Sequence, residues 1–290
     1  MTARSRVAAV LVSAMMALPA GCSDGANEPD WVDAFGYSDE QVFPFAIGDF
    51  GFPYVQVAID DDRLDLPFDT GNTIGVMLST EAFDRLGLAA IETHTPYDSA
   101  GRPGKPLRTS EVSGVSLLGR DLGPGRVFEL GNPNLDGLVG PVLFPRGHIT
   151  FDYGSKRLAL GDGPLPDSIP GYRALPLIRS ASHPSLILVR GSIEGRPALL
   201  EIDTGKSRCV VNPDLSADLG LARVKGGVVI EAMQLGDLSF AVPRAKEVDQ
   251  GGIDPGLPQP ILAGIGSDLL SRFVWTVDYD ADLLWVPESL

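Results

Sequence analysis

Cysteine and histidine are scarce in this 290-residue chain. It contains two cysteines, Cys22 and Cys209, and three histidines, none of which stand at a CxxC, HxxxH or HExxH spacing. Because zinc sites are built from such clusters, the sequence predicts no metal site, and nothing in it indicates a cofactor. Cys209 lies in an apolar run typical of a buried strand, so we expect a small core residue rather than half of a disulfide.

Basic and aromatic residues are also few. Lysine and arginine number 23 against 38 aspartates and glutamates, which gives a formal net charge of −15, and aromatic residues make up 7% of the chain. Most of such a surface would repel a nucleic-acid backbone, so we expect no nucleic-acid partner. With 34 glycines, 24 prolines and 44% hydrophobic residues, the composition favours a folded protein made mainly of short β-strands and tight turns.

The apolar run at the N-terminus is too short to span a bilayer. It covers residues 7–18 and follows Arg4 and Arg6, an arrangement typical of an export signal. It ends Leu18-Pro19-Ala20-Gly21-Cys22, which resembles a bacterial lipoprotein signal, in which the cysteine becomes the lipidated first residue.

This resemblance implies a signal peptide over 1–21, lipidation of Cys22, and attachment to the membrane of the cell envelope through that lipid. The alternative that the sequence leaves open is a secreted or periplasmic soluble protein. Residues 22–41 are polar and acidic, and we expect them to form a flexible tether.

The rest of the chain contains one internal repeat. In each half, two strand-like runs lead into Asp-Thr-Gly, and a further strand and a short helix that ends at a glycine follow. Later in each half, an apolar stretch ending in glycine precedes a hairpin. The expected strands are 54–59, 64–68 and 74–78, with a helix after Ser79, in the first half, and 186–193, 198–202 and 209–211, with a helix after Asn212, in the second; the hairpins are 149–160 and 275–285.

The first half holds extra residues in its middle. Asp69 and Asp203 are 134 positions apart, whereas the hairpin residues Tyr153 and Tyr279 are 126 apart. The surplus falls in the Gly/Pro-rich stretch 97–106. The Pro/Gly-rich segment 161–171 is the natural boundary between the halves, so we expect an N-terminal β lobe over 42–165 and a C-terminal β lobe over 166–290.

These motifs resemble those of the aspartic proteases of the pepsin and retropepsin type, over residues 42–288. The matching residues are Asp69-Thr70-Gly71 with Leu138-Val139-Gly140, and Asp203-Thr204-Gly205 with the less regular Gly264-Ile265-Gly266. The resemblance implies a mainly β, bilobal fold of two pseudo-twofold-related lobes with short helices. It also implies that Asp69 and Asp203 are catalytic, and that the Thr and Gly of each motif support them.

The chemistry of two adjacent carboxyl groups explains these residue types. Two carboxylates about 3 Å apart do not both ionise readily, so they share a proton and titrate as a coupled pair. The ionised member can take a proton from a water while the protonated member donates to a peptide carbonyl. The threonine hydroxyl can bond across the junction, and the glycine lets backbone amides approach the carboxylates.

The sequence departs from the family directly after each Asp-Thr-Gly. Pepsins have Ser or Thr there, and retroviral enzymes often Ala, whereas this chain has Asn72 and Lys206. We expect Lys206 to point to solvent; a Lys206 folded toward Asp203 would instead lower the pKa of that carboxyl.

The family also carries a hairpin flap over its cleft, in pepsins with a tyrosine. The best candidate here is 97–107, with Gly101 and Gly104 as hinge-like residues. Tyr97 is either a flap tyrosine or an ordinary exposed loop residue, and the second interpretation is favoured.

Other acidic residues are expected to be structural. Asp152 and Asp278 correspond across the halves, but each opens a hairpin turn. The run Asp60-Asp61-Asp62 predicts a solvated hairpin turn rather than a calcium site, because no spaced acidic ligands follow it.

The sequence thus predicts an exported, monomeric aspartic endopeptidase that acts on peptides or proteins. One alternative is an envelope peptide-binding protein that retains the fold but not the catalysis, with Asn72 and Lys206 as signs of lost chemistry. Another is a pair of independent modules on a linker, in which residues 172–290 would fold alone.

Overall fold

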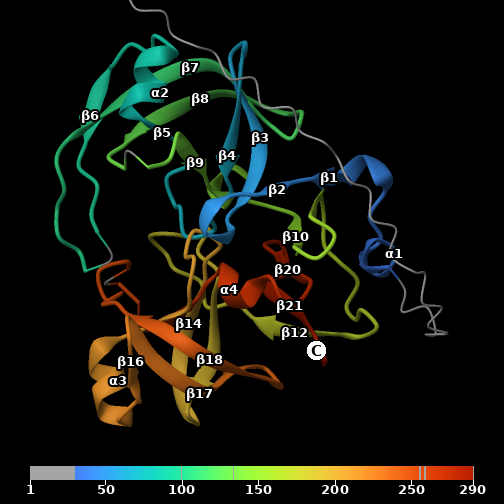
Figure 1. Cartoon of the computed structure of the whole chain (residues 1–290). Helices are drawn as coiled ribbons and strands as arrows, with labels where there is room; N and C mark the ends of the chain where they lie inside the picture. The colour runs from blue at the N-terminus through green and yellow to red at the C-terminus, as the bar shows by residue number, and fades with distance from the viewer. Residues whose placement is uncertain (1–29, 99, 133, 255, 258, 290) are drawn as a thin grey trace, which may run out of the picture. The chain divides into compact units, whose positions relative to one another are not determined.

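Strands dominate the structure, as the composition predicts (Figure 1). The computed structural model describes residues 30–98, 100–132, 134–254, 256–257 and 259–289, and residues 31–290 group into one unit. The helices are short: α1 (Trp31–Phe35), η1 (Asp39–Gln41), η2 (Asp49–Gly51), α2 (Thr80–Arg85), η3 (Pro141–Leu143), α3 (Pro213–Leu219) and α4 (Ser267–Leu270). Within the described residues, no helix has the length and apolar character needed to cross a membrane.

The strands form three sheets in the described part of the chain. The first-half sheet has eight strands: β2 (Ala46–Ile47), β3 (Pro53–Ile59), β4 (Asp62–Pro67), β5 (Val76–Ser79), β6 (Glu92–His94), β7 (Leu107–Leu117), β8 (Arg120–Leu130) and β9 (Gly137–Val139). The second-half sheet has seven: β13 (Leu188–Ile193), β14 (Arg196–Ile202), β15 (Val210–Val211), β16 (Arg223–Val224), β17 (Gly227–Leu235), β18 (Leu238–Glu247) and β19 (Ile261–Ile265). The third sheet has six: β1 (Val42–Pro44), β10 (His148–Asp152), β11 (Arg157–Gly161), β12 (Tyr172–Pro176), β20 (Trp275–Asp278) and β21 (Leu283–Pro287).

The first two sheets repeat the same plan. The hairpin β3–β4 leads into the first Asp-Thr-Gly, and the hairpin β13–β14 leads into the second. After it, β5 lies between β8, to which it is parallel, and β9, to which it is antiparallel; β15 lies in the same way between β18 and β19. The predicted internal repeat is therefore a repeat of structure.

The short helices after β5 and β15 begin where the sequence predicts. The Ser79 hydroxyl accepts a hydrogen bond from the Ala82 amide, and the Asn212 side chain accepts two amide bonds at the start of α3. Such caps satisfy amides that the first helical turn leaves without partners. Gly220 ends α3 in the left-handed conformation, at φ 61°.

The third sheet joins the halves. Strands β10 and β20 pair antiparallel, with Thr150 opposite Thr276 at the centre of the pairing and their hydroxyl oxygens 2.6 Å apart. The segment 161–171, which we expected to separate two lobes, connects β11 and β12 within this one sheet. Two independent modules would share no such sheet.

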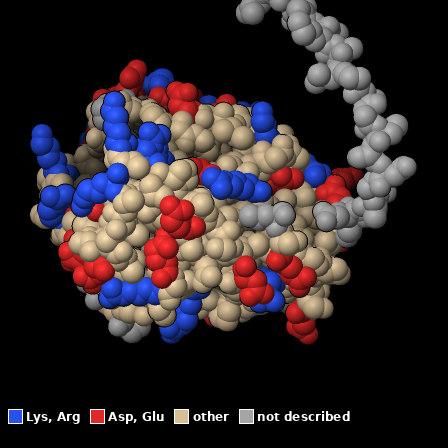
Figure 2. Space-filling view, turned by 60° about the horizontal axis from the view of Figure 1, so that its bottom comes forward, with Lys and Arg blue, Asp and Glu red and all other residues tan. Residues whose placement is uncertain are grey.

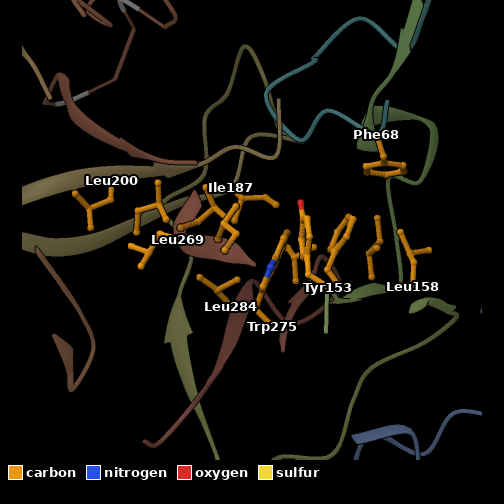
Figure 3. Close-up of a cluster of buried hydrophobic side chains, with 14 of the residues drawn as sticks. Phe68, Tyr153, Leu158, Ile187, Leu200, Leu269, Trp275 and Leu284 are labelled. Atoms are coloured by element: carbon orange, nitrogen blue, oxygen red, sulfur yellow. The ribbon is translucent and has the colours of Figure 1, made fainter. Parts of the chain in front are cut away.

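The hydrophobic core also runs through both halves. Phe151 of β10 and Trp275 of β20 stack with ring centroids 4.4 Å apart. Figure 3 shows the continuous cluster, which extends from Phe68 and Leu158 of the first half to Leu200 and Leu284 of the second. Because the apolar contacts cross the junction, each half fixes the position of the other.

The prediction of a flexible tether over 22–41 is wrong for its C-terminal part. Trp31 and Phe35 of α1 are 6% and 3% exposed, and they pack with Tyr37 and Trp285 against the six-stranded sheet. The Trp31 indole also donates a 2.7 Å hydrogen bond to Asp152 Oδ2. The prediction gave weight to the acidic residues of the segment and overlooked its aromatic residues, which are spaced so that their side chains are buried in one cluster. Residues 1–29, which include the predicted signal and Cys22, lie outside the described residues.

Candidate active site

The two Asp-Thr-Gly loops interlock through their threonines. The Thr70 amide donates to Thr204 Oγ1 over 3.0 Å, and the Thr204 amide donates to Thr70 Oγ1 over 2.9 Å. Each hydroxyl then donates across the junction to a strand carbonyl, Thr70 to Ile202 and Thr204 to Phe68. Both threonines are fully buried, so all four bonds are shielded from water. This pairing is the one predicted for the threonines.

The glycines of the two loops bring the carboxyl groups together. A Cβ on Gly71 would lie 2.7 Å from Asp203 Oδ2, and a Cβ on Gly205 would lie 2.3 Å from Asp69 Oδ1. Each glycine amide also donates to the aspartate of its own loop, over 2.9 Å to Asp69 and 2.8 Å to Asp203. Each carboxyl thus rests on the backbone of the opposite loop, where a larger residue would collide.

Asp69 and Asp203 are electrostatically unequal. Removal from bulk water, followed by the negative charge of Asp203, raises the pKa of Asp69 well above its usual range. Burial acts in the same direction on Asp203, but the charge and the hydrogen bond of Lys206 outweigh it, so the pKa of Asp203 is lowered. A single proton in this pair therefore resides on Asp69, and Asp203 carries the charge.

Lys206 does not point to solvent, and our expectation for it is wrong. Its ammonium group contacts Asp203 Oδ2 and lies 2.6 Å from Glu201 Oε2, with 18% of the side chain exposed. Burial alone would lower the pKa of Lys206, but Asp203 and Glu201 outweigh it and raise that pKa. Asp203 Oδ1 accepts from the Gly205 amide, so Lys206 supports the second, outer oxygen. It stands directly after the second Asp-Thr-Gly, where the resemblance to pepsins would place Ser or Thr, and it supplies a cation there.

Glu201 and Gln250 complete this cluster, and the sequence analysis missed both. Each is 1% exposed, and Gln250 Nε2 donates to Glu201 Oε2 over 2.6 Å. Burial raises the pKa of Glu201 despite the nearby Lys206. A glutamate within the buried, otherwise apolar stretch 198–202 of β14, five residues before a lysine, is a signal that could have found the pair. No comparable signal marks Gln250, because it lies in a loop far along the chain.

Asn72, the counterpart of Lys206 in the first loop, is used differently. Its Nδ2 donates to the Gly75 carbonyl over 2.6 Å, and its Oδ1 accepts from the Ile74 amide over 2.9 Å. The side chain therefore closes its own loop, as asparagine does in Asx turns. The two halves share a backbone plan, but only the second places a charge beside its aspartate.

A cavity of about 1090 Å³ opens above the two aspartates. Asp69, Asp203 and Lys206 lie in its wall, together with residues of the loop 95–101 and of the loop 249–253. Its apolar wall includes Ile74 and Phe128. The cavity is large enough for several peptide side chains, and charged groups meet at one place within it.

The surplus stretch of the first half forms a loop that reaches across this cavity. It joins β6 to β7, whereas the equivalent strands β16 and β17 of the second half are joined by the tight turn Lys225-Gly226. A Cβ on Gly252 would lie 1.9 Å from the Gly101 amide nitrogen, so the loop touches the 249–253 segment (Figure 1). Tyr97 lines the cavity but is 67% exposed, as an ordinary loop tyrosine would be.

The remaining acidic residues have the structural roles predicted for them. Asp152 accepts the Ser155 amide, and Asp278 accepts the amides of Asp280 and Ala281, so each holds its hairpin turn. Asp60 is exposed at the β3–β4 turn, where it binds Ser113 and Gly114. Cys209 is fully buried, as expected of a small core residue. In the described ranges, no group of three potential ligands could hold a metal ion.

The geometry thus unites the residues that the sequence singled out, Asp69, Thr70, Gly71, Asp203, Thr204 and Gly205, and adds Lys206, Glu201 and Gln250 to them. Comparison with known proteins adds no assignment: no protein-family model matches the chain, and a search of curated proteins finds no match to it.

Proposed function

We propose that this protein is an aspartic endopeptidase that hydrolyses peptide bonds with Asp69 and Asp203. The observation that carries the proposal is the reciprocal threonine bonding, which places two carboxyl groups from separate loops over each other's glycines inside a cavity. The repeated plan of the first two sheets, and the third sheet that joins the halves, fit the proposed two-lobed acid-protease fold.

The unequal environment of the pair assigns a role to each carboxyl. Asp203, ionised beside Lys206, is the base that takes a proton from a water held between the two groups. Asp69, which holds the shared proton, donates it to the oxygen of the peptide carbonyl as the water oxygen attacks the carbon. The product of this step is a neutral tetrahedral diol, with the proton now on Asp203.

The second step returns the protons and breaks the peptide bond. Asp203 gives its proton to the amide nitrogen, the C–N bond breaks, and Asp69 recovers a proton from one hydroxyl of the diol as the carbonyl re-forms. One water is consumed and both carboxyl groups return to their starting states. The backbone amides of Gly71 and Gly205 keep the carboxylate oxygens in place throughout.

We further propose that the enzyme works in the cell envelope as a monomer, held by a lipid on Cys22 or exported without one. The proposal rests on the export-type N-terminus. A chain that carries one aspartate in each half needs no second copy to complete the site.

Cleavage of denatured casein tests the activity. The purified chain is incubated from acid to neutral pH, with and without a statine-type transition-state mimic, beside the Asp69→Asn and Asp203→Asn variants. We expect cleavage that the mimic inhibits and that either substitution abolishes. Undiminished cleavage by either variant would exclude the pair.

A second candidate is a peptide-binding protein without catalysis, and the Lys206–Asp203 ion pair favours it. A cation that stabilises the carboxylate also makes it a weaker base. Binding of the statine-type mimic without cleavage at any pH would select this candidate over the enzyme.

A further inference from the structure

A second groove lies on the other side of the catalytic loop of the second half. It has a volume of about 680 Å³, and Lys206 lines both it and the cavity above the aspartates. Its walls come from the η2 segment and the β8–β9 loop of the first half, and from residues 205–210 and the end of β18 of the second. The cavity that contains both aspartates and this groove therefore meet at the same residue.

The internal repeat relates these two spaces to each other. The spacing of 134 that separates the aspartates also separates Thr73 from Ser207 and Ile74 from Arg208. The first member of each pair lines the large cavity, and the second lines the groove. Equivalent positions thus line two adjoining spaces, but Ile74 is apolar where Arg208 is a cation.

The groove has an excess of positive charge. Arg208 and Lys246 line it, and in the part of the chain that the structure describes neither forms an ion pair. Lys206 is already neutralised by Asp203 and Glu201, and the one carboxyl in the groove wall is that of Asp49. Two unpaired cations in a protein of net charge −15 are available to an acidic ligand.

The two cations of the groove act at short range. Charges of both signs occur on the face drawn in Figure 2, with basic side chains gathered at its upper left and acidic ones below them. Two nearby cations act over a few ångströms, within the screening length of physiological salt. The groove would therefore select an acidic ligand through direct contact of its charge with Arg208 and Lys246.

Apolar surface lies beside the two cations. Phe50 is 66% exposed at φ 66°, and its ring is 6.0 Å from that of Phe52. An exposed aromatic residue in a left-handed backbone conformation stays there only when the neighbouring structure holds it. The groove can thus cover the apolar stem of a side chain whose charged end reaches Arg208.

We propose that the Arg208 groove is a substrate subsite that selects peptides with an acidic residue on that side of the scissile bond. On the other side, beside Ile74 and Phe128, the cavity accepts an apolar residue. This proposal rests on the proposed peptide hydrolysis and names the class of substrate for it. The groove would bind such a peptide whether or not the bond is then cut.

Peptide pools test the subsite in two ways. Octapeptide pools carry Glu, Gln, Lys or Leu at one fixed position, scanned along the chain, with the other positions randomised. The wild-type protein is assayed for cleavage, and the Asp69→Asn variant for binding by fluorescence anisotropy. We expect the Glu pool to exceed the Gln pool about tenfold at one position, with the difference shrinking as salt is raised.

Variants then locate the selectivity. Arg208→Ala combined with Lys246→Ala should reduce the Glu/Gln ratio to about one, and Arg208→Glu should favour the Lys pool. Arg244→Ala is the matched control, because Arg244 lies on the same strand as Lys246, is exposed and does not line the groove. Its Glu/Gln ratio should equal that of the wild type.

The outcomes separate the subsite from the activity. A Glu preference in binding without any cleavage would support the subsite and contradict the enzyme. Cleavage without a Glu preference, or a preference that survives the double substitution, would overturn the subsite and leave the enzyme. Neither binding nor cleavage of any pool would overturn both.

Discussion

Replacing Lys206 by methionine tests the assignment of charge within the aspartate pair. Methionine retains the length of the side chain and removes the ammonium group that contacts Asp203 Oδ2. In the proposed reaction the active form of the pair carries one proton, so activity should fall at acid pH when Asp203 gains a proton and at alkaline pH when Asp69 loses its own. Lys206 lowers the pKa of Asp203, which extends activity toward acid pH.

The size of the shift follows from the contact. An opposite charge within 4–6 Å lowers a carboxyl pKa by about 1–3 units, and each unit corresponds to about 1.4 kcal/mol. Methionine at 206 should therefore move the acid limb of the kcat/KM profile upward by about 1–3 pH units. Lys206 is a smaller influence on Asp69 than burial and Asp203 are, so the alkaline limb should move upward less.

The assay is the pH dependence of kcat/KM on a peptide identified from the casein digest. Because Lys206→Met leaves Glu201 buried without its cation, the Glu201→Gln/Lys206→Met double variant is measured beside it. Lys206→Arg retains the charge and should keep the acid limb near that of the wild type, and Lys225→Met, in an exposed turn, serves as the matched control. An acid limb that stays at its wild-type pH in both methionine variants would refute the assignment.

Four further predictions follow from other contacts. Thr204→Val leaves the Thr70 amide and the Phe68 carbonyl buried without partners, and should lower the free energy of unfolding by about 3 kcal/mol in urea titrations, whereas Thr93→Val on an exposed strand should change it little. Gly252→Ala places a methyl group against the Gly101 amide and should push the loop 95–106 away. We expect faster amide hydrogen exchange in this loop and a changed KM. In the control Gly251→Ala, the added methyl group meets only Asp249, and neither effect is expected. Trp31→Ala should destabilise the fold by about 3–5 kcal/mol and expose residues 31–41 to proteolysis, and a wild-type melting curve would contradict the packing of α1. Cys22→Ser should move the protein from the detergent phase to the aqueous phase in Triton X-114 partitioning, and no change would exclude a lipid at this residue.

Local sequence signals correctly predicted the mainly β content and most of the strands and short helices around the two Asp-Thr-Gly motifs. The strands before each Asp-Thr-Gly, the capped helices and the hairpins all follow from short-range patterns, because alternation and capping act within a few residues. The segment around Trp31 was misjudged because its burial depends on Trp285, at the far end of the chain. The segment contains acidic residues between its aromatic ones, so its composition resembles that of a disordered tether although its aromatic side chains are packed.

The two aspartates of the site were predicted because their motifs are short-range, but the contacts of their charged neighbours were missed. The repeated Asp-Thr-Gly is a local motif, and its duplication indicated two facing carboxyl groups. Lys206 was predicted to point to solvent because most lysines are exposed, but here two buried carboxylates hold its ammonium group. One of these, Glu201, depends in turn on Gln250, and no local pattern connects 250 to 201.

The two halves differ at the residue directly after Asp-Thr-Gly, and this difference makes the surroundings of the two aspartates unequal. A pair with equal surroundings would share its proton equally, and either carboxyl could serve as base. Lys206 beside Asp203 and Asn72 turned into its own loop remove that equivalence. In the proposed reaction the water would therefore lose its proton to Asp203, and the carbonyl would gain a proton from Asp69. Two residues further along, Ile74 and Arg208 differ in the same way. With the proposed subsite, a peptide that places an acidic side chain at Arg208 would meet the aspartates in one orientation, so residues of the same two loops would set both the direction of proton transfer and the direction of peptide binding.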